Sequence, residues 1–199
     1  MPLERFPDDG PLLVALAAAN ENDVEFGRAS RDPAAFARAR NAESDFIVAA
    51  RRNLDRALEI DPVSVEGRVR RAHVDVLTKD DRAATSRLEA ILSSNPSGEW
   101  RYITLLLLSR VRERAGDLET AARLDVDALK LYPDAQSGFV ALAEVFHHIG
   151  ESHAAAVVAD RLFARHVSEE SDDPWWSYRL GHWKVAEPVL EQLRQEARQ

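Results

Sequence analysis

Apolar residues recur with helical spacing along most of the chain, and prolines interrupt this pattern at nearly even intervals. Pro62 and Pro96 lie 34 residues apart, and Pro96 and Pro133 lie 37 residues apart. Each proline follows an apolar helical run, as in "ALEIDPVSVEGR". Proline lacks a backbone N–H donor and moves the preceding residue out of the α region, so it ends helices. The pattern therefore predicts an all-α protein built from helical repeats.

Small residues repeat with the same spacing. The alanines of this series are separated by 34, 37 and 34 residues: Ala50, Ala84, Ala121 and Ala155. Gly116 and Gly150 are also 34 residues apart. Alanines allow neighbouring helices to approach closely, and glycine permits the left-handed backbone that closes a helix. Each repeat is thus expected to be a helix pair with a tight turn, and pairs of this kind stack because one alone cannot bury its apolar face.

These markers resemble the tetratricopeptide repeat family, whose unit is two antiparallel helices. The best copy is "FVALAEVFHHIGESHAAAVVADRLFARH", which matches the family at Phe139, Leu142, Ala143, Phe146, Gly150, Ala155 and Leu162. The copy "LLLLSRVRERAGDLETAARLDVDALKLYP" departs at Asp125, where the family prefers a large apolar residue. The copy "RVRRAHVDVLTKDDRAATSRLEAILSSNP" keeps Ala72, Ala84, Leu88, Ile91 and Pro96. Upstream, "AARRNLDRALEIDP" matches a second helix, but the first helix before it carries Arg38 at a small-residue position.

The resemblance implies an α-solenoid, a right-handed superhelix of antiparallel helix pairs. Residues 32–167 are expected to hold about four pairs, of which the first is atypical. Residues 1–31 are expected to form a helix from Pro11 to Asn20 and a mobile loop from Asn20 to Asp32. Residues 168–199 are expected to form Trp-rich capping helices, with Asp173 capping a short helix that begins at Pro174 and ends at Gly181.

In this family the first helices line a concave groove that holds a ligand. The register places an apolar floor with polar points in this groove, at Val69, His73, Val76, Ile103, Leu106, Arg110, Arg114, Val140, Glu144, His147 and His148. Such a mixture suits a peptide, with Arg110 or Arg114 binding an acidic side chain or a terminal carboxylate. One subgroup of this family binds the acidic C-terminal tails of chaperones through Lys and Asn at groove positions. Binding of that kind is not supported here, because those positions hold His73, Arg110 and Glu144. Alternatively, these side chains pack internally, or the N-terminal segment fills the groove.

The C-terminal stretch holds three of the four tryptophans, at Trp175, Trp176 and Trp183. One interpretation is an aromatic plug over the open end of the helical array. The other is a surface that binds a partner, because Trp is enriched at interface hot spots. The two interpretations are compatible if different Trp faces serve them.

The composition narrows the classes of partner. A formal net charge of -8 gives no electrostatic reason to expect nucleic acid or an anionic membrane. "PLLVALAAA" is too short to span a bilayer and follows an acidic flank, so membrane insertion is not expected. We expect a soluble protein, cytoplasmic or exported with its signal already removed. The chain has no cysteine, which excludes disulfides and thiolate chemistry.

The candidate catalytic chemistry is limited to one histidine cluster. His147, His148 and His153 lie within "HHIGESH", and Glu144 and His148 have the spacing of two neighbours on one helix face. A metal site is one interpretation and polar surface residues are the other, which we favour. The sequence contains no phosphate-binding glycine motif, zinc-hydrolase motif or nucleophile elbow. No cofactor is predicted.

We therefore predict a non-enzymatic interaction scaffold that holds a partner protein or peptide in its groove, in an assembly where it acts as an accessory subunit. The first alternative is a structural module that forms a homodimer through its Trp-rich end. The second is a metal-dependent enzyme that uses the histidine cluster.

Overall fold

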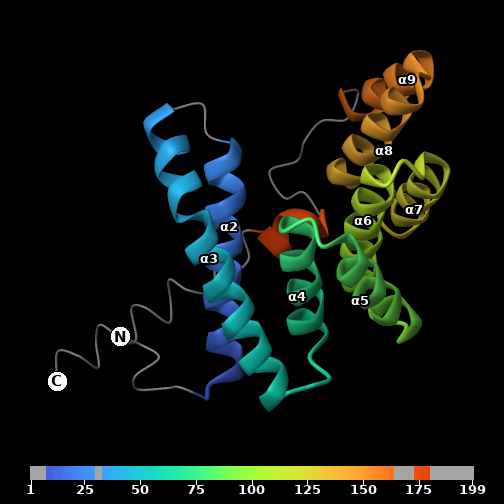
Figure 1. Ribbon diagram of the computed structural model, residues 1–199. Helices are drawn as coiled ribbons and strands as arrows, with labels where there is room; N and C mark the ends of the chain where they lie inside the picture. The colour runs from blue at the N-terminus through green and yellow to red at the C-terminus, as the bar shows by residue number, and fades with distance from the viewer. Residues whose placement is uncertain (1–7, 30–32, 164–172, 180–199) are drawn as a thin grey trace, which may run out of the picture. The chain divides into compact units, whose positions relative to one another are not determined.

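The computed structural model describes residues 8–29, 33–163 and 173–179 of the chain (Figure 1). All regular secondary structure in these ranges is helical, which confirms the all-α class for this part of the protein. Within the same ranges no helix combines the length and apolarity that a bilayer crossing needs. The described residues belong to two compact units. One is made of the helices before Asp61 together with residues 175–179, and the other of residues 61–163 together with 173 and 174.

The first unit is built on a helical hairpin of α2 (Gly10–Ala29) and α3 (Pro33–Ile60) (Figure 1). Small and branched apolar side chains are buried along both helices: Leu13, Val14, Ala17, Ala18, Val24, Ala50, Leu54 and Ala57. Burial of each Leu or Val contributes about 1.5–3 kcal/mol relative to exposure. The hairpin therefore has its own apolar core.

α2 differs from the expected end at Asn20 and continues as helix to Ala29, through most of the predicted loop. Two polar residues of this stretch are buried and bind the C-terminal part of the chain. The Glu21 carboxylate accepts a hydrogen bond from the Tyr178 hydroxyl at 3.2 Å, and the Asn22 amide donates to the Arg179 carbonyl oxygen at 2.6 Å. Local composition is misleading here because the polar residues have tertiary partners.

α3 also differs from expectation, since it is one helix of 28 residues where the repeat pattern predicts a helix pair. Pro33 stands at its first position, where proline is favourable, and neither proline nor glycine follows before Ile60. Nothing in the sequence therefore stops the helix until Asp61 and Pro62. The predicted first repeat is thus not a hairpin, and α3 pairs with α2 instead.

The short helix predicted to begin at Pro174 is present, over residues 174–179. In the first unit, Trp175 and Tyr178 are buried with their ring centroids 5.8 Å apart, and Arg179 forms an ion pair with Glu25 at 2.6 Å. The aromatic rings and the polar contacts to α2 together attach this segment to the hairpin. The predicted end at Gly181, the final helix and Trp183 lie outside the described residues.

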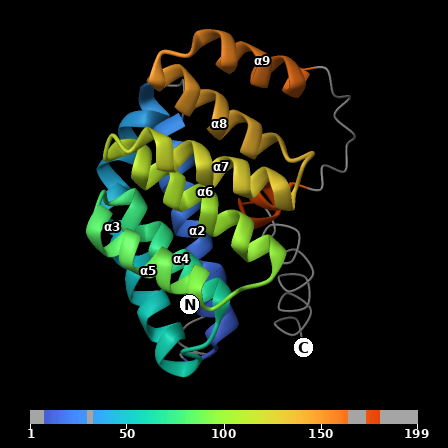
Figure 2. The same ribbon diagram turned by 90° about the vertical axis from the view of Figure 1, so that its right-hand side faces the viewer.

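The second unit consists of helix pairs in sequence order. The helices are α4 (Val65–Leu77), α5 (Asp81–Ser93), α6 (Gly98–Arg114), α7 (Leu118–Leu131), α8 (Gln136–Ile149) and α9 (Ser152–Phe163). Each helix packs against the next, and α6 also packs against α4 and α8 (Figure 2). The pairs α4/α5, α6/α7 and α8/α9 coincide with the three best copies of the sequence repeat, and the marker prolines fall in the connections between pairs.

The turns inside the pairs follow the predicted chemistry. Gly116 and Gly150 have positive φ angles of 79° and 90°, as the spacing predicts, and Lys79 adopts the same left-handed region at 59°. Asp80 and Asp117 then cap α5 and α7 by accepting hydrogen bonds from backbone N–H groups of the first turn. Local sequence therefore sets where these helices end and restart.

The core of the second unit combines close contacts between helices with a series of hydrogen bonds between polar side chains. Ala72, Ala84, Ala121 and Ala128 are fully buried, as expected for residues where helices approach closely. At Gly138 an added Cβ would lie 2.8 Å from Leu129, so α8 packs there without room for a side chain. The Tyr102 hydroxyl bonds to the Ser137 hydroxyl at 2.8 Å, and Asp173 accepts from the N–H and hydroxyl of Ser137, both at 2.8 Å. Burial also raises the pKa of Tyr102, which keeps it neutral.

Candidate functional site

The predicted groove residues divide into a buried set and an exposed set. The buried set lies on α4 and the first half of α6, at Val69, His73, Val76, Ile103 and Leu106, all with at most 7% of their surface exposed. Such burial is typical of core residues. The exposed set lies on the end of α6 and on α8, at Arg110, Arg114, Val140, Glu144, His147 and His148. The candidate surface is therefore the face shared by these two helices.

Two residues of this face connect α6 to α8 directly. The Nδ1 atom of His148 lies 2.7 Å from a carboxylate oxygen of Glu113. On the same two helices, Val140 is 42% exposed, and Arg110, Glu144 and His147 are also exposed. An apolar side chain thus lies on the same pair of helices as charges of both signs, a composition suited to a peptide chain.

Arg114 has a structural role that the sequence does not reveal. Its guanidinium donates to the Val76 carbonyl oxygen at 3.0 Å and forms an ion pair with Asp81. These contacts tie the end of α6 to α4 and to the start of α5. The guanidinium donors of Arg114 are therefore used in packing within the second unit.

A buried acid lies behind this face. Asp125 of α7 is fully buried, and among the described residues no hydrogen bond of ordinary geometry reaches its carboxylate oxygens. The nearby Ser109 hydroxyl donates to the Ala121 carbonyl oxygen at 3.2 Å, so it acts on Asp125 only as a weak, poorly aligned donor. Burial raises the pKa of Asp125 to about 7; the Ser109 hydroxyl opposes the rise, the Glu113 and Glu144 carboxylates add to it, and Arg110 opposes it. Charged side chains of α6 and α8 therefore act on a group that can take up a proton near neutral pH.

The three histidines do not converge on one point in the structure. His147 and His148 are adjacent on α8 with ring centroids 6.0 Å apart, and His148 is occupied by Glu113. His153 is exposed on α9, beyond the turn at Gly150. Across the described ranges, no three His, Cys, Asp or Glu side chains are grouped in a way that could hold a metal ion.

The described tryptophans of the C-terminal stretch differ in exposure. Trp175 is buried beside Tyr178 in the first unit, whereas Trp176 is 44% exposed. A buried ring serves packing, while an exposed ring offers contact area to a partner. Trp176 therefore stays a candidate interface residue.

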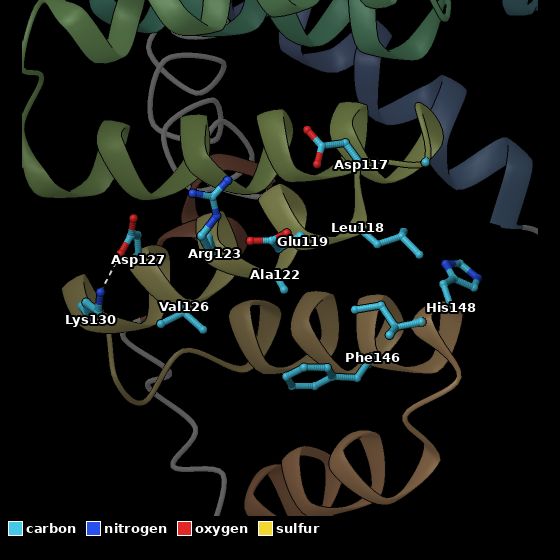
Figure 3. A pocket seen from close by; sticks show the side chains of 12 residues that line it. Asp117, Leu118, Glu119, Ala122, Arg123, Val126, Asp127, Lys130, Phe146 and His148 are labelled. Atoms are coloured by element: carbon cyan, nitrogen blue, oxygen red, sulfur yellow. Dashed lines mark hydrogen bonds and ion pairs between the residues drawn. The ribbon is translucent and has the colours of Figure 1, made fainter.

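Sequence reasoning missed an apolar pocket between α7 and α8 (Figure 3). The pocket has a volume of about 840 Å³, and its apolar lining comes from Leu118, Ala122, Val126, Phe146 and Ile149. Figure 3 shows Leu118, Ala122 and Val126 on α7 facing Phe146 on α8. Val126 and Ile149 are 39% and 41% exposed. A comparison of equivalent positions in successive repeats contains the signal, because Glu89 stands where α7 has Val126.

Comparison of the sequence with models of known protein families gives no match. Comparison with curated proteins gives no match either. The functional proposal therefore depends on the repeat pattern and on the surface of the second unit.

Proposed function

We propose that the second unit is a tetratricopeptide-like solenoid and that the protein is a non-enzymatic scaffold that binds a partner protein. Three sequence copies with common spacing coincide with three consecutive helix pairs. The first helices of these pairs follow one another in contact, from α4 to α6 and from α6 to α8. Stacked pairs of this kind offer an extended surface along their first helices, which suits the binding of a peptide chain.

The observation that carries this proposal is the exposed mixture on α6 and α8. Val140 can bury an apolar side chain of the partner, which supplies affinity. Arg110 can form a bidentate contact with a carboxylate, which supplies orientation. The expected partner is therefore a protein segment with an apolar residue next to an acidic side chain or a chain terminus.

Capture of partners from the native organism tests this function. The wild-type chain is compared with Arg110→Glu combined with Val140→Asp, which reverses the charge and removes the apolar contact. The matched control combines Arg82→Glu on α5 with Val157→Asp on α9, because both residues are exposed and neither belongs to the candidate surface. A partner retained by the wild type and the control but lost by the surface variant is the expected result.

A titration then measures the effect. For the captured partner, or a peptide from it, we expect the surface variant to raise the dissociation constant at least about tenfold. Interface residues at the centre of a contact often contribute more than about 1.4 kcal/mol, which corresponds to this factor. Equal affinities for the variant and the control would contradict binding on α6 and α8. Circular dichroism of all variants checks that the helices are intact.

A further inference from the structure

Successive repeats can be compared position by position in the second unit. The N-cap residues Asp80 and Asp117 are 37 residues apart, so each α5 position corresponds to the α7 position 37 residues later. The positive-φ residues Gly116 and Gly150 close α6 and α8 and are 34 residues apart. The α5/α6 contact and the α7/α8 contact are thus equivalent interfaces of the repeat.

The α5/α6 interface is closed at its surface by two ion pairs. Arg112 of α6 binds Glu89 of α5 at 2.6 Å, and Arg114 of α6 binds Asp81 of α5. Long charged side chains of this kind also cover apolar surface with their stems. They satisfy the charged groups and shield the contact between the two helices.

Neither ion pair exists at the α7/α8 interface, because apolar residues replace most of the charges. Phe146 stands at the position of Arg112 and Val126 at the position of Glu89. His148 stands at the position of Arg114 and Leu118 at the position of Asp81. All four replacements line the pocket of Figure 3. The pocket therefore lies at the place that the preceding repeat closes with charged side chains.

The exposed stripe of α7 next to the pocket has an ordered charge pattern. Its charges alternate from negative to positive, in the order Glu119, Arg123, Asp127 and Lys130. The stripe is about 16 Å long, at 1.5 Å per helical residue. Reversing its direction inverts the sign at every position. An antiparallel copy of α7 therefore places opposite charges face to face, whereas a parallel copy would place like charges together.

We propose that this surface binds a second copy of the chain, with α7 of each copy lying antiparallel to α7 of the other over the pocket. Glu119 then faces the partner's Lys130, and Arg123 faces the partner's Asp127. Ala122 and Val126 lie at the centre of the stripe, and Phe146 and Ile149 supply apolar contact from α8. This surface extends beyond the α6/α8 face proposed for a partner protein, although His148 borders both.

The ion pair between Lys130 and Asp127 within one chain does not prevent these residues from pairing with a second copy. Lys130 binds Asp127 at 2.7 Å, but their side chains are 69% and 53% exposed. Exposed pairs of this type contribute little to stability. Exchanging them for equivalent pairs across a two-fold axis, with burial of the apolar lining, favours the dimer.

The first test is the mass of the full chain in solution, measured by sedimentation and light scattering from about 1 μM to about 1 mM, the range of dissociation constants for weak interfaces. We expect the mass to rise from the monomer value of 22.3 kDa toward twice that value. Val126→Asp should remove this rise, and Val157→Asp should not, since both valines are exposed on helices of the same unit. A chain that stays monomeric over the whole range overturns the proposal.

The second test uses charge reversal. Recovery of association in a mixture of two variants distinguishes a lost contact from unfolding. Glu119→Lys gives positive charges at both ends of the stripe, and Lys130→Glu gives negative charges at both ends. Each variant alone should dimerise at least about tenfold more weakly, because like charges face each other. An equimolar mixture should recover the wild-type affinity as a heterodimer, because all charges are then complementary. A mixture no tighter than either variant, or a dimer lost only in Trp176→Ala, overturns the antiparallel α7 contact.

Discussion

The α4/α5 hairpin and the α6/α7 hairpin each bury one carboxylate, but in different surroundings. In the first, Asp75 accepts hydrogen bonds from Arg71 of its own helix and from Arg87 of α5, the latter at 2.9 Å. In the second, Asp125 is fully buried, forms no ion pair with any described residue, and has a pKa raised by burial to about 7. The same repeat therefore accommodates a buried acid either as a paired charge or as a protonated group.

The second helices of these hairpins also differ in polarity at equivalent positions. α5 has Leu88 buried and Glu89 exposed, the ordinary arrangement of an amphipathic helix. α7 has Asp125 buried and Val126 exposed at the same two positions. This inversion lowers stability, because the carboxyl of Asp125 is buried, and it leaves the apolar side chain of Val126 exposed to solvent. Departures of this kind are expected where a sequence serves a function other than folding.

The largest expected effect concerns the paired acid. Asp75→Asn should lower the free energy of unfolding by about 3–5 kcal/mol at pH 7, because it removes the buried carboxylate that pairs with both Arg71 and Arg87. Urea unfolding measures the change. Asp160→Asn is the control, since Asp160 is exposed on α9. A loss no greater than that of the control would contradict the role of the ion pairs.

Asp125, in contrast, should lower the stability of the protein when its carboxyl is charged. The carboxyl of Asp125 stays protonated in the folded protein up to about pH 7, while in the unfolded chain it ionises near pH 4. Its stabilising contribution is therefore fully present below about pH 4 and lost as the pH rises toward 7. Relative to Asp125→Asn, the wild type should lose about 3 kcal/mol of unfolding free energy between pH 4 and pH 7.

Urea unfolding of wild type and Asp125→Asn over this pH range gives the difference, in which the titration of all other groups cancels. A constant difference would show that the carboxyl has an ordinary pKa. Asp125→Leu should raise stability further at pH 8, because Leu88 fills the equivalent position of α5.

Transfer of the first interface onto the second tests the origin of the pocket. Val126→Glu combined with Phe146→Arg installs the residues that form the Glu89–Arg112 ion pair. We expect the dissociation constant of self-association to rise at least tenfold, about 1.4 kcal/mol, while the free energy of unfolding changes by less than about 1 kcal/mol. Sedimentation and urea unfolding measure the two quantities.

The reciprocal change serves as the control. Glu89→Val combined with Arg112→Phe should open a second apolar surface between α5 and α6 and increase association. If neither exchange alters association, the difference between the two interfaces has no role in binding a second copy.

The smallest expected effect is the loss of the surface ion pair itself. Glu89→Ala should lower the free energy of unfolding by about 0.5 kcal/mol, since the side chains of Glu89 and Arg112 are 53% and 29% exposed. The effect should decline at about 1 M salt, where the Debye length is about 3 Å. A double-mutant cycle with Arg112→Ala isolates the pair. A coupling energy that persists in high salt would indicate a packing role instead.

Local rules account for what the sequence predicted well. The helix pairs from α4 to α9, the left-handed turns at Gly116 and Gly150, and the start of a short helix at Pro174 each depend on residues within a few positions. The same rules failed at α2 beyond Asn20. There the buried Glu21 and Asn22 are satisfied by residues more than a hundred positions away in the chain.

The candidate site was predicted less completely than the helices. The repeat register selected α6 and α8 residues that are exposed in the structure, such as Arg110 and Val140, and the binding role of this face stays a prediction. It also selected Val69 and Ile103, which are buried, because periodicity identifies a helix face but not what covers it. The pocket beside Val126 was missed, although the change from Glu89 to Val126 between successive repeats is present in the sequence.

The sequence by itself determined the helical class, the positions of the repeat turns and the caps, since backbone sterics and short-range hydrogen bonds act within one or two turns of chain. Tertiary structure alone decided that α3 continues unbroken and pairs with α2, and that Arg114 is used in packing. It also decided that Asp125 is enclosed, with no ion pair to the part of the chain that the structure describes. These outcomes depend on which distant side chains meet, and the free energy of burying or pairing a group is set by that meeting.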